Sequence, residues 1–285
     1  MKENIKIYQE SLEKNIDDIS KILDDLEMTF PDLMQIYKRA LLASSENIAN
    51  KWASERKYQR TYFVQTAFSN FYPKEITELS LYIDAMVNIL DDLFDENLNK
   101  EVKGLYILEF SRVFSLYNYC YPDKKIQEMV GQYFNKLIVL ALTEDIYGKL
   151  IKEEKDLNKI VKYSAELLLC RAMDIDIFIE IALQDQGDKS DNIRKIGRIF
   201  RALSILKKDV KDIEHDTKNN IDTVITDIVS KKEILFNEYI ESLIAHLLDR
   251  ADKINKDDVS EEVKTPTEGF SKMIKNIIKE IKEII

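Results

Sequence analysis

Apolar side chains recur at helical spacing along almost the whole chain, and few residues interrupt them. Between residues 4 and 27 the apolar positions alternate with charged ones, in the stripe Ile7, Leu12, Ile16, Ile19, Ile22 and Leu23. Such a stripe is typical of an amphipathic helix with one buried face. Six Gly and four Pro in 285 residues are too few for many short strands and turns. The pattern therefore predicts an all-α protein of about ten helices.

Prolines, asparagines and polar stretches divide this pattern into the expected helices. Apart from the first, we expect them over residues 31–50, 73–95, 100–120, 123–142, 157–184, 192–216 and 221–252, with a further helix start at 143–145. Residues 57–71 form an aromatic-rich run, which either packs into the core or forms the wall of a cavity. The main domain would span 1–252, a polar connector 253–268, and a C-terminal amphipathic helix 269–285. That last helix either docks on the body or, because lysines flank its apolar side, touches a membrane surface.

The first candidate for chemistry is an acid cluster at the end of the helix predicted over 73–95. Asp91, Asp92 and Asp95 project from one side, because an α-helix turns about 100° per residue. Carboxylates so close repel each other unless a cation neutralises them, and hard oxygen ligands suit Mg²⁺. The alternative is a solvated acidic helix end, although acids at a helix C-terminus oppose the helix dipole.

A second acid cluster follows more than a hundred residues later. Asp209, Asp212 and Asp216 are spaced i, i+3 and i+7 and should share one helix face. Lys208 and Lys211 are interspersed, so a surface ladder of ion pairs is the alternative. If the two acid clusters converged across a helical bundle, they could hold several Mg²⁺ ions. Such a site fits a substrate with many negative oxygens, such as a diphosphate.

Arg171 is the third candidate, because it stands in the largely apolar run from Leu167 to Phe178. An arginine in such a run needs an anionic partner. Asp174, one turn later, could be that partner. Alternatively, the guanidinium grips phosphate oxygens through two parallel hydrogen bonds.

With these three features the chain resembles the class I terpene synthases of the isoprenoid-synthase fold. Asp91-Asp92-Leu93-Phe94-Asp95 matches the Asp-Asp-x-x-Asp motif of that family. Lys208-Asp209-x-x-Asp212-x-x-x-Asp216 is similar to its Asn-Asp-x-x-Ser-x-x-x-Glu motif, with Lys for Asn, Asp for Ser and Asp for Glu. Arg171, Asp174 and Ile175 resemble the family's diphosphate-sensing arginine, its linker and its effector carbonyl.

The resemblance implies a helical bundle around a central cavity, in which a linear prenyl diphosphate of C15 or C20 length is ionised. The two acid clusters would hold roughly three Mg²⁺ ions together with the diphosphate. The diphosphate would be bound by Arg171, Lys208 and His215, and the carbocation would become a cyclic or linear terpene. The pocket positions, chosen by their spacing from the motifs, are Phe63, Val87, Asn88 and Phe178.

Two other functions remain open at this stage. The Asp-x-x-x-Asp spacing within both clusters also fits head-to-head synthases of the squalene and phytoene type, a prenyltransferase alternative. A catalytically inactive helical interaction protein is the alternative outside enzymes. A homodimer is compatible with the sequence.

Composition narrows the environment of the protein. A net charge of −10 argues against a broad nucleic-acid surface, which needs a basic face. Cys120 and Cys170 lie in apolar helical context, as expected for thiols in a reducing compartment. The N-terminus is unlike a signal peptide, and no apolar stretch reaches the ~20 residues that a bilayer requires. We therefore expect a cytoplasmic protein without stable membrane insertion.

Overall fold

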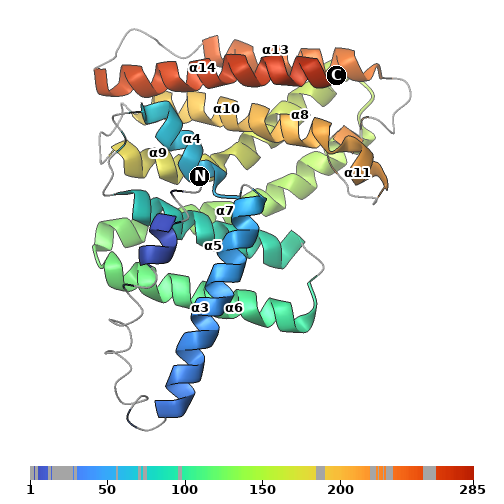
Figure 1. Cartoon of the computed structure of the whole chain (residues 1–285). Coiled ribbons are helices and arrows are strands. Elements are labelled where there is room, and N and C mark those ends of the chain that lie inside the picture. The colour runs from blue at the N-terminus through green and yellow to red at the C-terminus, as the bar shows by residue number, and fades with distance from the viewer. Residues whose placement is uncertain are drawn as a thin grey trace. The chain divides into compact units, whose positions relative to one another are not determined.

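The chain is helical throughout the part that the computed structural model describes (Figure 1). The described residues are 31–55, 57–69, 76–95, 98–183, 190–218, 234–252 and 261–285, with the shorter pieces 3, 6–11, 14, 28, 72, 223, 225–226 and 228. Eleven α-helices and one 3₁₀ helix have defined bounds there, and none of these residues forms a strand. The all-α prediction is thereby confirmed. Within the same residues, no helix is long and apolar enough to cross a bilayer.

The chain divides into two compact units. Unit 1 comprises Met1–Phe63 and Pro73–Val130, and unit 2 comprises Val64–Tyr72 and Gly131–Ile285. Two helices run from one unit into the other, α4 (Gln59–Phe68) and α7 (Lys124–Glu153). Since the first acid cluster belongs to unit 1 and the second to unit 2, each is described within its own unit.

Unit 1 is built on α3 (Pro31–Ser54), α5 (Thr77–Asp95) and α6 (Lys100–Cys120). Helix α6 packs against both α5 and α3. Every residue of α5 from Leu79 to Ile89 is buried, as expected for a helix that is apolar on nearly all sides. Asn99 caps α6 by accepting a hydrogen bond from the backbone N–H of Val102 at 2.9 Å.

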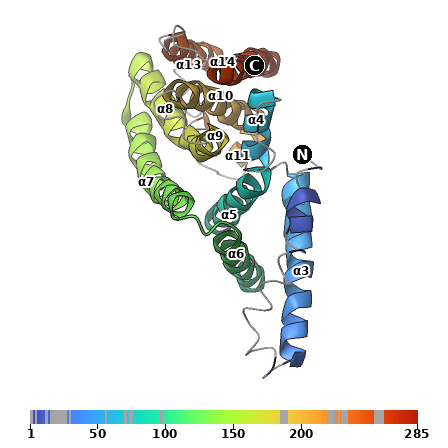
Figure 2. The ribbon, with the colours of Figure 1, turned by 90° about the vertical axis from the view of Figure 1, so that its left-hand side faces the viewer.

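Unit 2 is organised around α10 (Ser190–Lys211), which packs against most of its other helices (Figure 2). Its neighbours are α8 (Leu157–Arg171), the 3₁₀ helix η3 (Ala172–Ile175), α9 (Asp176–Leu183), α11 (Ile213–Lys218), α13 (Phe236–Asp252) and α14 (Glu261–Ile284). The C-terminal α14 docks on α10 through Phe270, whose ring lies 5.8 Å from that of Phe200. Its apolar side is thus covered by protein, as the docking interpretation predicts.

Four expected boundaries differ from the structure. Helix α7 continues through Thr143, whose hydroxyl donates to the Val139 carbonyl at 2.9 Å, so the predicted helix start there is wrong. The helix expected over 157–184 is interrupted by η3. The helix expected over 221–252 is interrupted at residues 234–235: residues 225, 226 and 228 are helical, and α13 begins at Phe236. Helix α14 begins within the expected connector and carries Pro266 inside it. Polar composition alone did not reveal that this segment is helical.

Candidate functional site

The first acid cluster forms the last turn of α5 in unit 1. Asp91 is exposed at the helix surface, whereas the side chain of Asp95 lies outside the described residues. Both residues belong to α5. Their metal role stays a prediction.

Asp92 has a different environment from Asp91, because it is almost completely buried. Its carboxylate accepts a hydrogen bond from the indole N–H of Trp52 at 2.9 Å and another from the ammonium group of Lys57. The ammonium group of Lys51 lies 3.6 Å away. Two cations therefore lie beside the buried carboxylate of Asp92 and balance its charge.

A buried network that the sequence analysis missed lies two turns earlier on α5. Asp84 is fully buried and accepts hydrogen bonds from Arg60 at 2.9 Å and from the backbone N–H and hydroxyl of Thr61 at 3.1 and 3.0 Å. Arg60 also donates to the side-chain oxygen of Asn88 at 3.0 Å, so this predicted pocket residue is held by the network. Burial raises the pKa of Asp84, and the Arg60 and Thr61 bonds oppose that rise. The sequence feature that could have revealed this network is an aspartate flanked by apolar residues within a predicted helix.

The second acid cluster has the arrangement that its spacing predicts. Asp209 and Asp216 are buried and Asp212 is half-buried. The other charged residues and the histidine of this segment are exposed, namely Lys208, Lys211, Glu214 and His215. A surface ladder of ion pairs therefore does not describe this helix face. Lys208 and His215, the predicted diphosphate ligands, are exposed beside it, and Nδ1 of His215 lies 3.3 Å from Asp216 Oδ1.

A joint in the backbone divides the second acid cluster. Helix α10 ends at Lys211 and α11 begins at Ile213, with Asp212 between them. The amide of Asp212 still donates to the Lys208 carbonyl, and the amide of Asp216 to the Asp212 carbonyl, both at 2.9 Å. The helical hydrogen-bond pattern thus continues across the joint and keeps the carboxylates on one side.

Arg171 lies beside this cluster. Its Nη1 is 3.5 Å from Asp209 Oδ2, and its Nε is 3.2 Å from Glu144 Oε1 on α7. About a third of the side chain is exposed, 34%. Asp174, the alternative partner, is bound by Arg201 through two guanidinium nitrogens at 3.0 and 2.8 Å. The structure thus brings together Arg171 and the second acid cluster, which were separate candidates in the sequence.

The electrostatics of Asp209 show how closely these groups interact. Burial raises the pKa of its carboxyl, Arg171 and Lys208 oppose the rise, and the carboxylates of Asp216 and Asp212 add to it. The ionised form of Asp209 is therefore disfavoured by both desolvation and like charge. A nearby divalent cation would relieve both effects.

The chain breaks its helix directly after Arg171. Residues 172–175 form η3, and α9 starts at Asp176. A carbonyl can act on a ligand only where it is released from the i→i+4 hydrogen bond of an α-helix. One carbonyl at this break, that of Asp174, accepts a hydrogen bond from the hydroxyl of Tyr133 at 2.9 Å. Ile175, the predicted effector, lies at the end of the same 3₁₀ turn and is buried.

Four ion pairs join the broken helix to α10 in antiparallel order, and we call them the interhelical ion pairs. They are Arg194–Glu180 at 2.6 Å, Arg198–Asp176 at 2.7 Å, Arg201–Asp174 at 2.8 Å and Arg171–Asp209 at 3.5 Å. In the first three the arginine is on α10. In the last pair the arginine is on α8 and the acid is on α10. This contact is also the longest of the four, so Arg171 is the least tightly held of these guanidinium groups.

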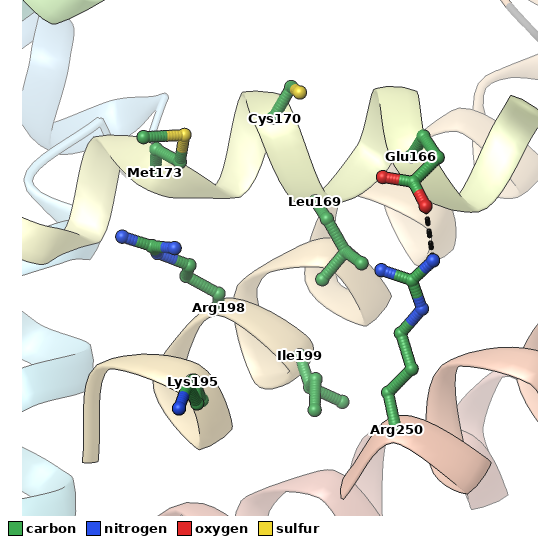
Figure 3. Close-up of a pocket in the computed structure, with 8 residues that line it drawn as sticks. All are labelled: Glu166, Leu169, Cys170, Met173, Lys195, Arg198, Ile199 and Arg250. Carbon is green, nitrogen blue, oxygen red and sulfur yellow. Dashed lines mark hydrogen bonds and ion pairs between the residues drawn. The ribbon is translucent and has the colours of Figure 1, made fainter. Parts of the chain in front are cut away.

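A pocket of about 370 Å³ opens between α8, α10 and α13 in unit 2 (Figure 3). Its lining consists of Glu166, Leu169, Cys170, Met173, Lys195, Arg198, Ile199 and Arg250. Cys170 is a free thiol and half-buried, as is Cys120 in unit 1. The predicted cation-pocket residues do not line this pocket: Phe178, Val87 and Asn88 are buried elsewhere, and Phe63 is half-buried.

In the part of the chain that the structure describes, no three His, Cys, Asp or Glu side chains gather closely enough to hold a metal ion by themselves. No protein-family profile, curated protein sequence or solved structure matches this chain. The chemistry of the residues in these sites therefore has to carry the functional assignment.

Proposed function

We propose that the protein is a Mg²⁺-dependent terpene synthase, which ionises a linear prenyl diphosphate and releases diphosphate and a terpene. The observation that carries this proposal is the contact of Arg171 with Asp209, at the start of the second acid cluster and immediately before the helix break. A cationic fork beside acidic oxygen ligands is what an anionic diphosphate bound through Mg²⁺ requires.

The donor set of the second acid cluster fits Mg²⁺. All three side chains offer hard carboxylate oxygens, and they share one helix face across the joint at Asp212. Asp91 and Asp95 keep the metal role that the resemblance gives them. Asp92 is assigned to positioning the end of α5, because Trp52 and Lys57 already occupy its oxygens. Bound Mg²⁺ would supply Lewis-acid stabilisation of the departing diphosphate.

The residues of the chain would then act as follows. Arg171 exchanges the long contact with Asp209 for phosphate oxygens, which its planar guanidinium can bind through two parallel hydrogen bonds. Lys208 and His215, exposed beside the cluster, add cationic or hydrogen-bonding contacts to the same group. The carbonyl at Ile175 points its partial negative charge at the allylic end as that carbon becomes positive. Phe178 in unit 2, and Phe63, Val87 and Asn88 in unit 1, keep the pocket roles that the resemblance gives them, and an aromatic face stabilises a desolvated cation by about 2 kcal/mol.

The proposal is tested by incubating the protein with C10, C15 and C20 prenyl diphosphates and Mg²⁺, with diphosphate release and extracted terpenes both measured. We expect turnover that requires Mg²⁺ and falls at least about a hundredfold in Asp209→Asn and Arg171→Gln, as expected when transition-state electrostatics are lost. Glu214→Gln is the matched control, because Glu214 lies in the same segment but points to solvent.

Each outcome of this assay separates the candidate functions. Product formation only when a second prenyl substrate is added would identify a coupling enzyme. No diphosphate release from any chain length would favour the interaction protein. Turnover that is equal in the wild type, Asp209→Asn and Arg171→Gln would show that catalysis does not use this site.

A further inference from the structure

The pocket between α8, α10 and α13 is chemically distinct from the acid clusters. Three of its lining residues are cationic, Lys195, Arg198 and Arg250, and one is acidic, Glu166. The chain as a whole carries a net charge of −10. Asp191 and Asp176 pair with Lys195 and Arg198 from outside the lining, but the lining itself carries more cations than acids, and cationic donors around a pocket favour an anionic ligand.

The charged groups stand at the two ends of the pocket. Figure 3 shows Arg250 reaching Glu166 at one end and Arg198 beneath Met173 at the other, with Leu169 and Ile199 between them. Each end is therefore polar, and the middle is apolar. A ligand that fills this space needs a charged group joined to an apolar body.

Each of the three cations has an acidic neighbour, but each retains a donor or an exposed surface for a further partner. Arg198 donates Nε and Nη2 to Asp176, which leaves Nη1 for another acceptor. Arg250 donates Nη2 to Glu166, and 36% of its side chain is exposed. Lys195 lies 2.5 Å from Asp191 and is more than half exposed. The pairs at the rim are of the weak, solvated kind that an incoming oxyanion can replace.

We propose that this pocket binds a small amphipathic oxyanion, a carboxylate or phosphate monoester with a short apolar chain. The oxyanion contacts Arg250 or the Lys195 and Arg198 pair, and the chain lies on Leu169 and Ile199. The volume of about 370 Å³ is at the lower end of the range for small-molecule sites. This inference does not rest on the proposed terpene synthase activity, since none of its residues belongs to the acid clusters.

Cys170 provides a direct reporter, because its thiol lines the pocket and is half-buried. Cys120→Ser leaves Cys170 as the remaining cysteine of the chain. The rate of maleimide labelling at Cys170 is then measured with increasing hexyl phosphate, hexanoate, inorganic phosphate or hexylamine. Burial and Glu166 raise the pKa of this thiol, so labelling is run at alkaline pH.

We expect hexyl phosphate, hexanoate or both to slow labelling saturably, and hexylamine not to. Either Arg250→Gln or Lys195→Gln should weaken the apparent affinity about tenfold, according to the end of the pocket that holds the oxyanion, and Glu166→Gln should strengthen binding if that end is the one with Arg250. Lys272→Gln, at an exposed position of α14, is the matched control. Far-ultraviolet circular dichroism establishes that every variant is folded.

Three results would overturn the proposal. They are the absence of saturable protection at millimolar concentrations, equal protection by hexylamine and hexyl phosphate, and unchanged affinity in both Arg250→Gln and Lys195→Gln. Protection by inorganic phosphate equal to that by hexyl phosphate would show that the apolar middle of the pocket does not contribute. Protection by one oxyanion class alone identifies which of the two head groups the pocket takes.

Discussion

We expect the same substitution, Asp to Asn, to have very different consequences at two buried carboxylates. Asp84 and Asp209 are 0% and 6% exposed, and burial raises the pKa of both. Their arginine partners differ. The side chain of Arg60 is 9% exposed and lies 2.9 Å from Asp84, whereas that of Arg171 is 34% exposed and lies 3.5 Å from Asp209.

The magnitudes follow from what each substitution leaves behind. Asp84→Asn removes the carboxylate that pairs with the buried guanidinium of Arg60, and removal of one partner of a buried ion pair costs about 3–5 kcal/mol. Asp209→Asn leaves Arg171 partly solvated and still 3.2 Å from Glu144. A pair with one solvated partner contributes about 0–1 kcal/mol, and the variant also avoids burying a charge. We therefore expect Asp209→Asn to lower the free energy of unfolding by less than about 1 kcal/mol.

Urea unfolding followed by circular dichroism measures both changes. Each variant is compared with the wild type under the same conditions. Glu10→Gln, in the exposed Lys6–Glu10 pair, gives the baseline for removing a carboxylate at the surface. A loss at Asp209 as large as that at Asp84 would refute the reasoning, because Asp209 would then be a structural partner of Arg171. Arg171 would then not be free to exchange Asp209 for a diphosphate, and the proposed diphosphate site would lose its support.

Three further predictions concern pH, packing and metal binding. Because burial raises the folded-state pKa of Asp209, its carboxyl stabilises the fold in acid and this contribution is lost as the pH rises through that pKa. The unfolding free energy of Asp209→Asn relative to the wild type should thus be highest near neutral pH, decline as the pH falls through the raised pKa of Asp209, and level off below the ordinary aspartate pKa of about 4. A pH-independent difference would contradict this. Gly269→Ala should cost about 1–3 kcal/mol in thermal melts, because a Cβ there overlaps the backbone of α4. Gly148→Ala, with nothing within 4 Å of the new Cβ, should instead stabilise by up to about 1 kcal/mol, and equal effects would count against this packing. Trp52, the single tryptophan, donates to the carboxylate next to Asp91, so Mg²⁺ with diphosphate should change its fluorescence, and Asp91→Asn should abolish the change. A wild-type titration without any change would argue against metal at the end of α5.

Helix ends with a local chemical cause could be predicted from the sequence. The expected helix over 100–120 coincides with α6, because Asn99 caps its first turn and Pro122 follows its last. The interruption at 172–175 could not be predicted, since apolar residues continue through Ala172 and Ile175 without a change of pattern. Apolar periodicity predicts which face of a helix is buried. It does not predict whether each backbone carbonyl accepts its i→i+4 hydrogen bond.

The site shows the same division between local and long-range information. Spacing alone predicted that Asp209, Asp212 and Asp216 share a face, because that follows from 3.6 residues per turn. The partners of the carboxylates could not be predicted in this way. Lys57 reaches Asp92 across 35 residues, and Arg171 reaches Asp209 across 38, which depends on how whole helices pack. Tertiary packing therefore decides which acids are already neutralised.

The order of charges along α10 also restricts the mechanics of unit 2. A slide of α10 by one turn along α8 and α9 would break all four interhelical ion pairs at once. These pairs therefore oppose shear between the helices. A small bend at Asp212 disturbs none of them, because the joint lies beyond Asp209. If Asp216 moves toward Asp209, the movement therefore takes place at the joint, which is itself part of the acid cluster. The arginines meanwhile hold the rest of α10 in register.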